Sequence, residues 1–404
     1  MQIRIVLSAL RKHRIATVLI ALEISLACAV FCNACFLISQ RLQAMRIDSG
    51  VDEAALGTVK LSGFDPQLAS DLNARVVAAL RGISAVKTVS VVNAVPFGEP
   101  GARAGVTLDQ EQQHFGGVID FYVGDASAIQ AFGLRLLSGR LPASEEYTPV
   151  AQYVPSNPPV LITQKLAEHL WPGQNPIGQR LWSMDTSFRV IGVIDHLSVS
   201  QPGGGEAEDP DWSVFVPAIP GPSLAGKYLI RGNPEDIPAI MRDSRDAVLK
   251  VAPDAVFDME QSRSLVELRD SYFKSSRVMA AMLFGVIVAL LGTTALGIVG
   301  LASFWVTQRR KQIGIRRALG ATRSDILRYF QIENFLIVSL GIVFGMLLAY
   351  GMSLVLMRAY ELPRLPLWYM PIGAVTLWIL GQLAVLAPAL RASGISPVAA
   401  IRAI

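Results

Sequence analysis

Four long apolar stretches divide the chain, and each is long enough to cross a membrane as a helix. The first begins at residue 15 and runs to residue 38 with Glu23 as its only charge. The other three carry no charge over 31, 24 and 26 residues. A bilayer core about 30 Å thick needs roughly 20 apolar helical residues. We therefore predict transmembrane helices at residues 15–38, 278–306, 335–356 and 370–390.

The long segment between the first two spans, residues 39–277, has the patterns of a folded α+β domain. Residues 57–61 and 86–92 alternate as strands do, and residues 66–81 between them have the apolar spacing of a helix. A second strand–helix–strand pattern covers residues 227–258. Two such units predict a split ferredoxin-like layer, with residues 100–220 inserted as a strand-rich subdomain. Its loop 201–211 is expected to be exposed and flexible.

The basic residues predict the orientation of the four spans. Residues 1–14 hold four cations, and the segment 307–334 holds seven against two acids. Because positive charge collects on the cytoplasmic side, we place both segments, and the tail 391–404, in the cytoplasm. Residues 39–277 and the short loop 357–369 are then extracytoplasmic. The first apolar run exceeds the 7–15 residues of the apolar core of a signal peptide, so we expect it to remain as a span.

Composition excludes a cytosolic enzyme and a secreted domain, since 52% of residues are apolar and only 17% are charged. A pI near 9.0 would suit nucleic acid, but the charges are segregated. Residues 41–277 hold 21 basic against 28 acidic residues, and the remainder holds 15 against four. The basic excess therefore belongs to the membrane flanks, and no nucleic-acid partner is expected.

The chain offers no pattern typical of a catalytic, cofactor-binding or metal site. The segment Gly221–Lys227 has P-loop spacing, but Tyr228 follows where Ser or Thr would hold magnesium, and a strand follows instead of a helix. Asp195, His196 and Ser198 are close in sequence, whereas real triads assemble across a fold; His196 is expected at a strand end. The four histidines are scattered and the three cysteines lie in the first apolar stretch.

Two features inside the predicted spans have open interpretations. Glu23 would be costly if isolated in lipid, so it either couples to a proton or substrate or forms a hydrogen bond with a Thr or Ser on a neighbouring span, such as Thr293 or Thr294. We favour the hydrogen bond, because no second intramembrane acid or base completes a relay. Gly341, Gly345 and Ala349 form a small-xxx-small ridge that allows close helix packing, either within the chain or in a dimer.

Several segments carry a family likeness over essentially the whole chain. The segment 308–328 (QRRKQIGIRRALGATRSDILR) resembles the coupling segment of FtsX-like permeases, the MacB-type class of ABC transporters. The tail 388–402 resembles the C-terminal signature of the same family. Residues 136–140, 166–178 and 190–195 are similar to its periplasmic core domain.

The resemblance implies that a short helix in this segment docks into a separate ATPase. Ile315 and Leu319 would share one helical face, and Arg316 and Arg317 offer planar donors for carboxylates. Gly314 and Gly320 permit turns or close backbone approach. A cationic helix resting on anionic lipid is the alternative, but it does not explain the glycines. Where the family often has Glu, this chain has Gln312. The predicted coupling residues are Gln312, Ile313, Gly314, Ile315, Arg316, Arg317, Ala318, Leu319, Gly320 and Ala321.

The resemblance also implies a function and a set of partners. The chain would be a non-catalytic permease subunit in the bacterial inner membrane that passes ATP-driven motion to its extracytoplasmic domain. It would bind no cofactor directly, with ATP and magnesium held by the partner ATPase. A permease homodimer and a periplasmic adaptor are further expected partners. Export of an antimicrobial, peptide or lipid-linked substrate is the expected role, and regulation of an extracytoplasmic enzyme or sensor without transport is the alternative.

Overall fold

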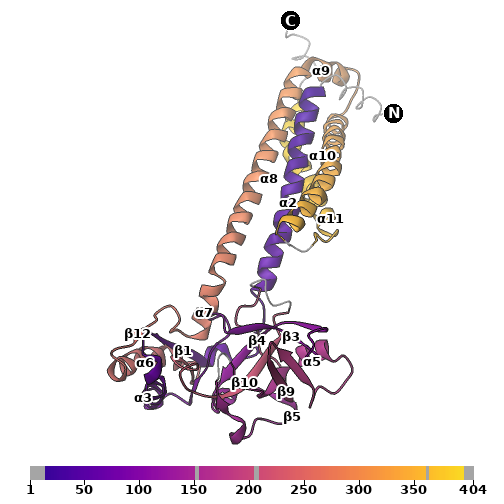
Figure 1. The fold of residues 1–404 in the computed structure, drawn as a ribbon. Coiled ribbons are helices and arrows are strands. Elements are labelled where there is room, and N and C mark those ends of the chain that lie inside the picture. Colours follow the sequence, from indigo (N-terminus) through magenta and orange to yellow (C-terminus); the bar gives the residue numbers. More distant parts are fainter. Residues whose placement is uncertain (1–13, 151–153, 204–208, 361–363, 395–404) are drawn as a thin grey trace. The chain divides into compact units, whose positions relative to one another are not determined.

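The computed structural model describes residues 14–150, 154–203, 209–360 and 364–394, and these form two compact units. One unit contains the helices of residues 14–43 and 276–394, and the other contains residues 44–275 (Figure 1). The first is called the membrane unit and the second the globular unit. The predicted N-terminal segment 1–14 and tail 391–404 lie mostly outside the described residues.

Within the described residues, the membrane unit has four helices long and apolar enough to cross a membrane. Each of the four predicted spans lies inside one of them, which confirms the predicted fold class for this unit. The helices extend beyond the uncharged stretches because polar residues at their ends continue the same backbone hydrogen bonding. Their bounds are α2 Arg14–Ala44, α8 Lys274–Gln308, α10 Arg323–Tyr360 and α11 Tyr369–Ser393. A short helix, α9 (Arg310–Ala318), lies between α8 and α10.

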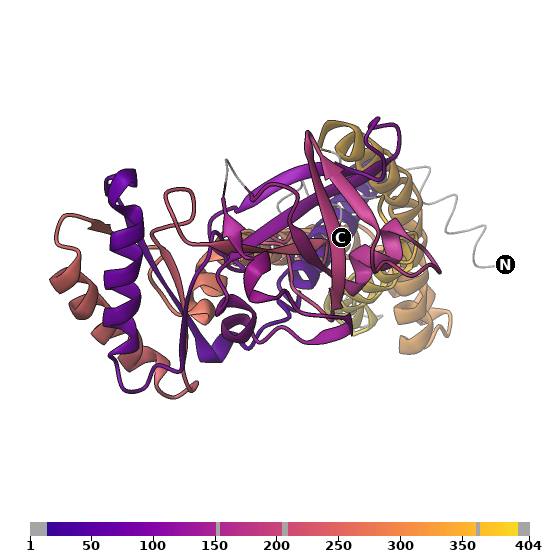
Figure 2. The ribbon, with the colours of Figure 1, turned by 60° about the horizontal axis from the view of Figure 1, so that its bottom comes forward.

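The globular unit contains the predicted ferredoxin-like layer. Its four strands are β1 Leu56–Ser62, β2 Thr88–Val91, β11 Lys227–Arg231 and β12 Val256–Phe257. They form an antiparallel sheet in the order β12-β1-β11-β2, with Val59 opposite Tyr228. The helices α3 (Ala69–Arg81) and α6 (Ile237–Val251) lie side by side on this sheet (Figure 2). Both predicted strand–helix–strand units are thereby confirmed.

The described residues between 102 and 219 form the predicted strand-rich subdomain, which is called the insert. Its eight strands share one mixed sheet in which β7 and β9 run parallel. Large apolar side chains such as Tyr122, Phe188 and Phe215 fill its interior. The strands are β3 Ala102–Thr107, β4 Phe115–Gly124, β5 Leu136–Gly139, β6 Thr148–Pro149, β7 Pro159–Thr163, β8 Arg180–Ser183, β9 Thr186–Ile194 and β10 Ser213–Ile219. The helices are α4 Ala128–Phe132 and α5 Gln164–Leu170.

The expectation of an exposed loop over 201–211 is wrong at its end. Residues 204–208 lie outside the described residues, but Asp211 is buried. Its carboxylate faces Nδ1 of His196 and lies 3.1 Å from Nζ of Lys165. His196 follows β9 as expected, and its Nε2 is 2.8 Å from the Asp48 carbonyl oxygen. Burial lowers the pKa of His196, but hydrogen bonding to Asp211 and to this carbonyl oxygen outweighs burial. The pKa of His196 is therefore raised.

A last helix of the globular unit, α7 (Leu265–Tyr272), directly precedes α8 in the sequence. Ser264 caps it: the Ser264 hydroxyl accepts a hydrogen bond from the Glu267 N–H at 3.2 Å, and the Glu267 carboxylate accepts one from the Ser264 N–H at 3.1 Å. This capping box fixes where the helix begins. The 3₁₀ turns of the globular unit are η1 Glu53–Ala55, η2 Pro66–Leu68 and η3 Ser144–Glu146.

Candidate functional site

The predicted coupling residues form α9 and the turn that follows it. The helix ends because Gly320 adopts a φ of +96°, which favours glycine. The Gly320 N–H donates to the Arg317 carbonyl at 3.2 Å and the Ala321 N–H to the Arg316 carbonyl at 3.1 Å, as in a glycine-terminated helix. Thr322 and Asp325 then cap the start of α10, with the Asp325 N–H donating to the Thr322 hydroxyl at 3.2 Å.

The inner face of α9 packs on the rest of the membrane unit. Ile313 and Gly314 are buried. Ile313 belongs to an apolar cluster with Ile326 and Phe330 of α10, and with Ala389 and Ala392 of α11. Ala321 is half-buried beside the same cluster. A displacement of α9 must therefore displace α10 and α11 or break this packing.

The outer face of α9 presents an apolar pair beside a cation. The side chains of Ile315 and Leu319 are 46% and 82% exposed. Arg316 is exposed, and its guanidinium lies 5.0 Å from the centre of the Tyr329 ring, which holds it over α10. Gln312 and Ala318 are exposed as well. This surface, made by Gln312, Ile315, Arg316, Ala318 and Leu319, is called the α9 outer face.

Arg317 has a different role from its neighbour. Its Nη1 donates a 2.8 Å hydrogen bond to the carbonyl oxygen of Ser393, the last residue of α11. A cation at a helix C-terminus meets the carbonyl end of the helix dipole, which is favourable. Arg317 therefore ties α9 to α11, and Arg316 is the member of the predicted pair that a partner could contact.

A buried ion pair that the sequence analysis did not identify lies at the start of α9. Arg309, between α8 and α9, has Nη1 3.0 Å from both carboxylate oxygens of Glu333 on α10. The two side chains are 11% and 2% exposed. The Arg309 guanidinium also lies 5.5 Å from the Trp305 ring. The pair joins the end of α8 to α10 across the coupling segment. The sequence signal for this ion pair is Glu333, an acid at the edge of the third apolar run.

The glycine ridge of α10 is a packing seam within the chain. A Cβ on Gly341 would lie 2.8 Å from Ile24, and one on Gly345 would lie 2.5 Å from Cys28. The carbonyl of Ala349 accepts a 3.1 Å hydrogen bond from Asn33. These contacts place α10 tightly against α2. Of the two interpretations that the sequence left open, the structure therefore assigns this ridge to intrachain packing.

The hydrogen bond expected between Glu23 and a threonine is absent among the described residues. Thr293 donates instead to the Leu290 carbonyl at 3.0 Å, and the buried Thr294 hydroxyl has no partner in the described part of the chain. The Glu23 carboxylate instead packs on α8, where a Cβ on Gly297 would lie 2.7 Å from Oε2. The absence of a side chain at residue 297 makes room for the carboxylate.

Two family models together match almost all of the chain. The MacB-like periplasmic core domain matches residues 18–263. The FtsX-like permease C-terminal model matches residues 282–397, which include α9, α10 and α11.

Relatives with similar sequences are transporter permeases. The ABC transporter permease YknZ of Bacillus subtilis is 22% identical over 347 residues, covering 84% of this chain and 83% of the relative. The macrolide export ATP-binding/permease protein MacB of Rhodospirillum rubrum is 24% identical over 375 residues, covering 90% of this chain and 53% of the relative. The chain spans only 29% to 53% of the MacB relatives that it matches.

Two solved structures match about half of the chain. The extracellular domain of YknZ from Gram-positive bacteria matches with 12% identity and a TM-score of 0.32, covering 50% of this chain and 99% of that one. The periplasmic region of MacB from Actinobacillus actinomycetemcomitans matches with 13% identity and a TM-score of 0.35, covering 57% and 97%.

Proposed function

Because the chain belongs to the MacB/FtsX-like family of ABC transporter permeases, we propose that it passes ATP-driven motion from a separate cytoplasmic ATPase to its globular unit. The family implies an ATPase partner and an inner-membrane location. In the proposed arrangement α9 and both termini are cytoplasmic and the globular unit is extracytoplasmic, as the positive-inside rule favours. ATP and magnesium are held by the partner, and this chain binds neither.

The observation that carries the proposal is the α9 outer face. Arginine is enriched at protein interfaces and among their energetic anchors, and a partner on this face would remove the two exposed apolar side chains from water. The exposed side chains of Ile315 and Leu319 form no hydrogen bonds with water, and Arg316 is preorganised by its contact with Tyr329. The opposite face of α9 is fixed by Ile313, Arg317 and the Arg309–Glu333 pair. A push on the outer face would therefore be transmitted to α8, α10 and α11.

The proposed work is export, done at the globular unit by a permease homodimer with a periplasmic adaptor. The chemical class of the substrate is an antimicrobial, peptide or lipid-linked molecule. The MacB relatives are named for macrolide export, and we extend only export, not the macrolide, to this chain. A reconstituted permease–ATPase complex that hydrolyses ATP but moves no such substrate would favour the alternative, which is regulation of an extracytoplasmic enzyme or sensor without transport.

The proposal predicts that the purified chain alone does not hydrolyse ATP above background. Phosphate release is measured for the permease in lipid nanodiscs, with and without the ATPase that co-purifies with it. We expect hydrolysis only when the ATPase is present, and a rate that depends on the permease. A control ATPase with its catalytic glutamate changed to glutamine should abolish the signal. Turnover by the permease alone would contradict the requirement for a partner.

Glu23→Gln is expected to leave ATP hydrolysis by the complex within a few-fold of the unchanged protein. Glutamine keeps the shape that fits against Gly297, and the carboxylate has no ionic partner among the described residues. Gly297→Val is the companion variant, because its Cβ would meet the carboxylate and should reduce activity more. Complete loss of activity in Glu23→Gln would instead support a coupling carboxylate.

A further inference from the structure

The loop of residues 93–101 joins β2 of the ferredoxin-like layer to β3 of the insert. At its centre Phe97 is buried and has a φ of +61°. Residues with a side chain rarely adopt this left-handed conformation, and it persists only where the surrounding structure enforces it. Such residues gather at functional and switch regions.

The Phe97 side chain packs on α7, and its backbone is bound to the insert. Its ring centre lies 5.9 Å from that of Tyr272 and 5.7 Å from that of Phe273, the residue after α7. The Phe97 N–H donates a 2.8 Å hydrogen bond to the carbonyl of Ser200 in the insert. Phe97 thus contacts both α7, which leads into α8, and the insert.

Arg269 on α7 binds the segment that follows α2 in the sequence. Its Nη2 donates to the carbonyls of Met45 at 2.9 Å and Ile47 at 2.7 Å, which follow α2 in the sequence. Its Nη1 is bound to the Glu53 carboxylate. The same guanidinium lies 4.9 Å from the centre of the Phe97 ring. The two connections, after α2 and before α8, are therefore held together beside Phe97.

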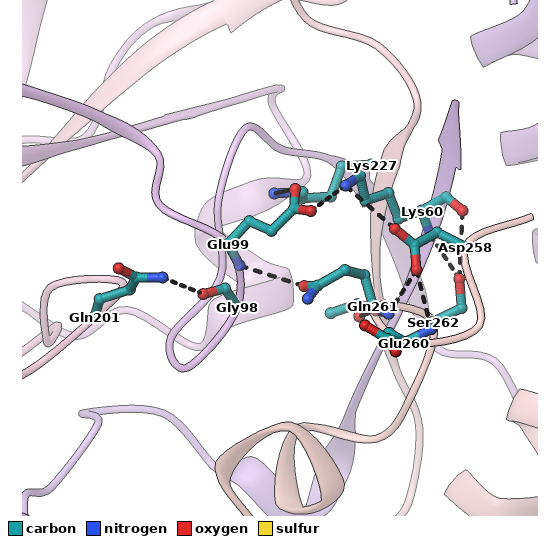
Figure 3. A network of polar contacts seen from close by, with 10 residues as sticks. Lys60, Gly98, Glu99, Gln201, Lys227, Asp258, Glu260, Gln261 and Ser262 are labelled. Atoms are coloured by element: carbon teal, nitrogen blue, oxygen red, sulfur yellow. Dashed lines mark hydrogen bonds and ion pairs between the residues drawn. The ribbon is translucent and has the colours of Figure 1, made fainter. Parts of the chain in front are cut away.

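A polar network fixes the other half of the loop (Figure 3). Glu99 is paired with Lys60 of β1 and lies 4.0 Å from Lys227 of β11. The Glu99 N–H donates to Gln261, in the segment before α7, at 3.3 Å. Gln201 of the insert donates to the Gly98 carbonyl at 3.4 Å. Burial, with the neighbouring Lys60 ammonium, lowers the pKa of Lys227 to about 8.

We propose that loop 93–101 is the relay that passes movement of α7 to the insert, with Phe97 as its positioning residue. The inference rests on the proposed function and adds the route inside the globular unit. The insert is joined to the ferredoxin-like layer by two chain connections, this loop and residues 220–226. A shift of α7 must carry Phe97, and through Ser200 the insert, or lose the ring contacts.

The test measures one distance between the layer and the insert in the whole permease–ATPase complex in nanodiscs. Spin labels are placed at two exposed positions, Ala78→Cys on α3 and Glu168→Cys on α5. The three cysteines of α2 are first changed to alanine. The distance is compared without nucleotide and with ATP trapped by vanadate. We expect a nucleotide-dependent change that Phe97→Leu largely removes, while ATP hydrolysis by the complex continues.

Phe188→Leu is the matched control, because its ring is equally buried but packs on Phe121 inside the insert, 4.9 Å between ring centres. It should keep the change in distance. If Phe97→Leu does not fold, Gln261→Ala tests the same relay from the other side of the loop and should reduce the change. An unaltered change in both variants overturns the relay alone. No change in the parent complex overturns the proposed function and the relay with it.

Discussion

The double change Arg316→Glu with Leu319→Asp is expected to abolish co-purification of the permease with its ATPase. Both side chains lie on the α9 outer face, and neither is needed to bury the helix against α10 and α11. An interface anchor costs about 2 kcal/mol or more when it is removed. Because each 1.4 kcal/mol is tenfold in affinity, losing Arg316 at that cost would weaken the complex about 30-fold, and the charge introduced at residue 319 should weaken it further. Tagged permease is extracted in mild detergent, and the retained ATPase is quantified.

Arg328→Glu is the matched control for this experiment. It reverses the same charge at an exposed position on α10 that is not part of the α9 outer face. We expect the control to retain the ATPase and both variants to insert in the membrane normally. If α9 instead rests on anionic lipid, the double change leaves co-purification intact and weakens only binding to vesicles that contain such lipid. That outcome would contradict the docking of α9 into the ATPase.

The same structure predicts that Arg317 behaves differently from Arg316. Because Arg317 is bound to the Ser393 carbonyl, its removal should loosen α9 on α11 before it affects a partner. The sequence could not separate the two residues. They are adjacent and equally charged, and the direction of each side chain depends on where α11 ends relative to α9. That relation joins residues 76 positions apart.

Sequence patterns were sufficient for most of the fold because its elements are locally specified. Apolar runs long enough to cross a bilayer define the four long helices, and the spacing of Leu72, Val76 and Leu80 defines the buried face of α3. The strand order β12-β1-β11-β2 also follows from two repeated strand–helix–strand units. Asp211 was misassigned because composition describes the glycine-rich loop before it, whereas its burial depends on His196 and Lys165.

The intramembrane carboxylate shows a similar limit. Sequence correctly marked Glu23 as needing a helix neighbour, but polar residues on α8 suggested the wrong contact. The residue that accommodates it is Gly297, which has no side chain to offer a hydrogen bond. The hydrogen-bonding residues of a sequence cannot reveal a space that exists because a side chain is absent. Such a space depends on the register of two helices that are far apart in the sequence.

Removing one partner of the Arg309–Glu333 pair is expected to be the most destabilising single change in the membrane unit. Both side chains are almost fully buried, and Nη1 of Arg309 is 3.0 Å from each carboxylate oxygen. In Glu333→Ala the guanidinium would keep its charge in a buried site without the carboxylate. Breaking one side of a buried pair costs about 3–5 kcal/mol. Thermal unfolding of the purified permease in detergent, followed by fluorescence, should therefore shift to a much lower midpoint.

The double variant Arg309→Met with Glu333→Leu separates the stability of the pair from its role in coupling. Apolar replacement of both partners is often neutral or stabilising by about 1–4 kcal/mol, so the unfolding midpoint should recover. If the pair also transmits movement between α8 and α10, the recovered protein will bind the ATPase normally but respond poorly to ATP. A double variant with full stability and full ATP response would show that the pair only stabilises the helix junction. Equal loss of stability in the single and double variants would contradict the cost of the unpaired charge.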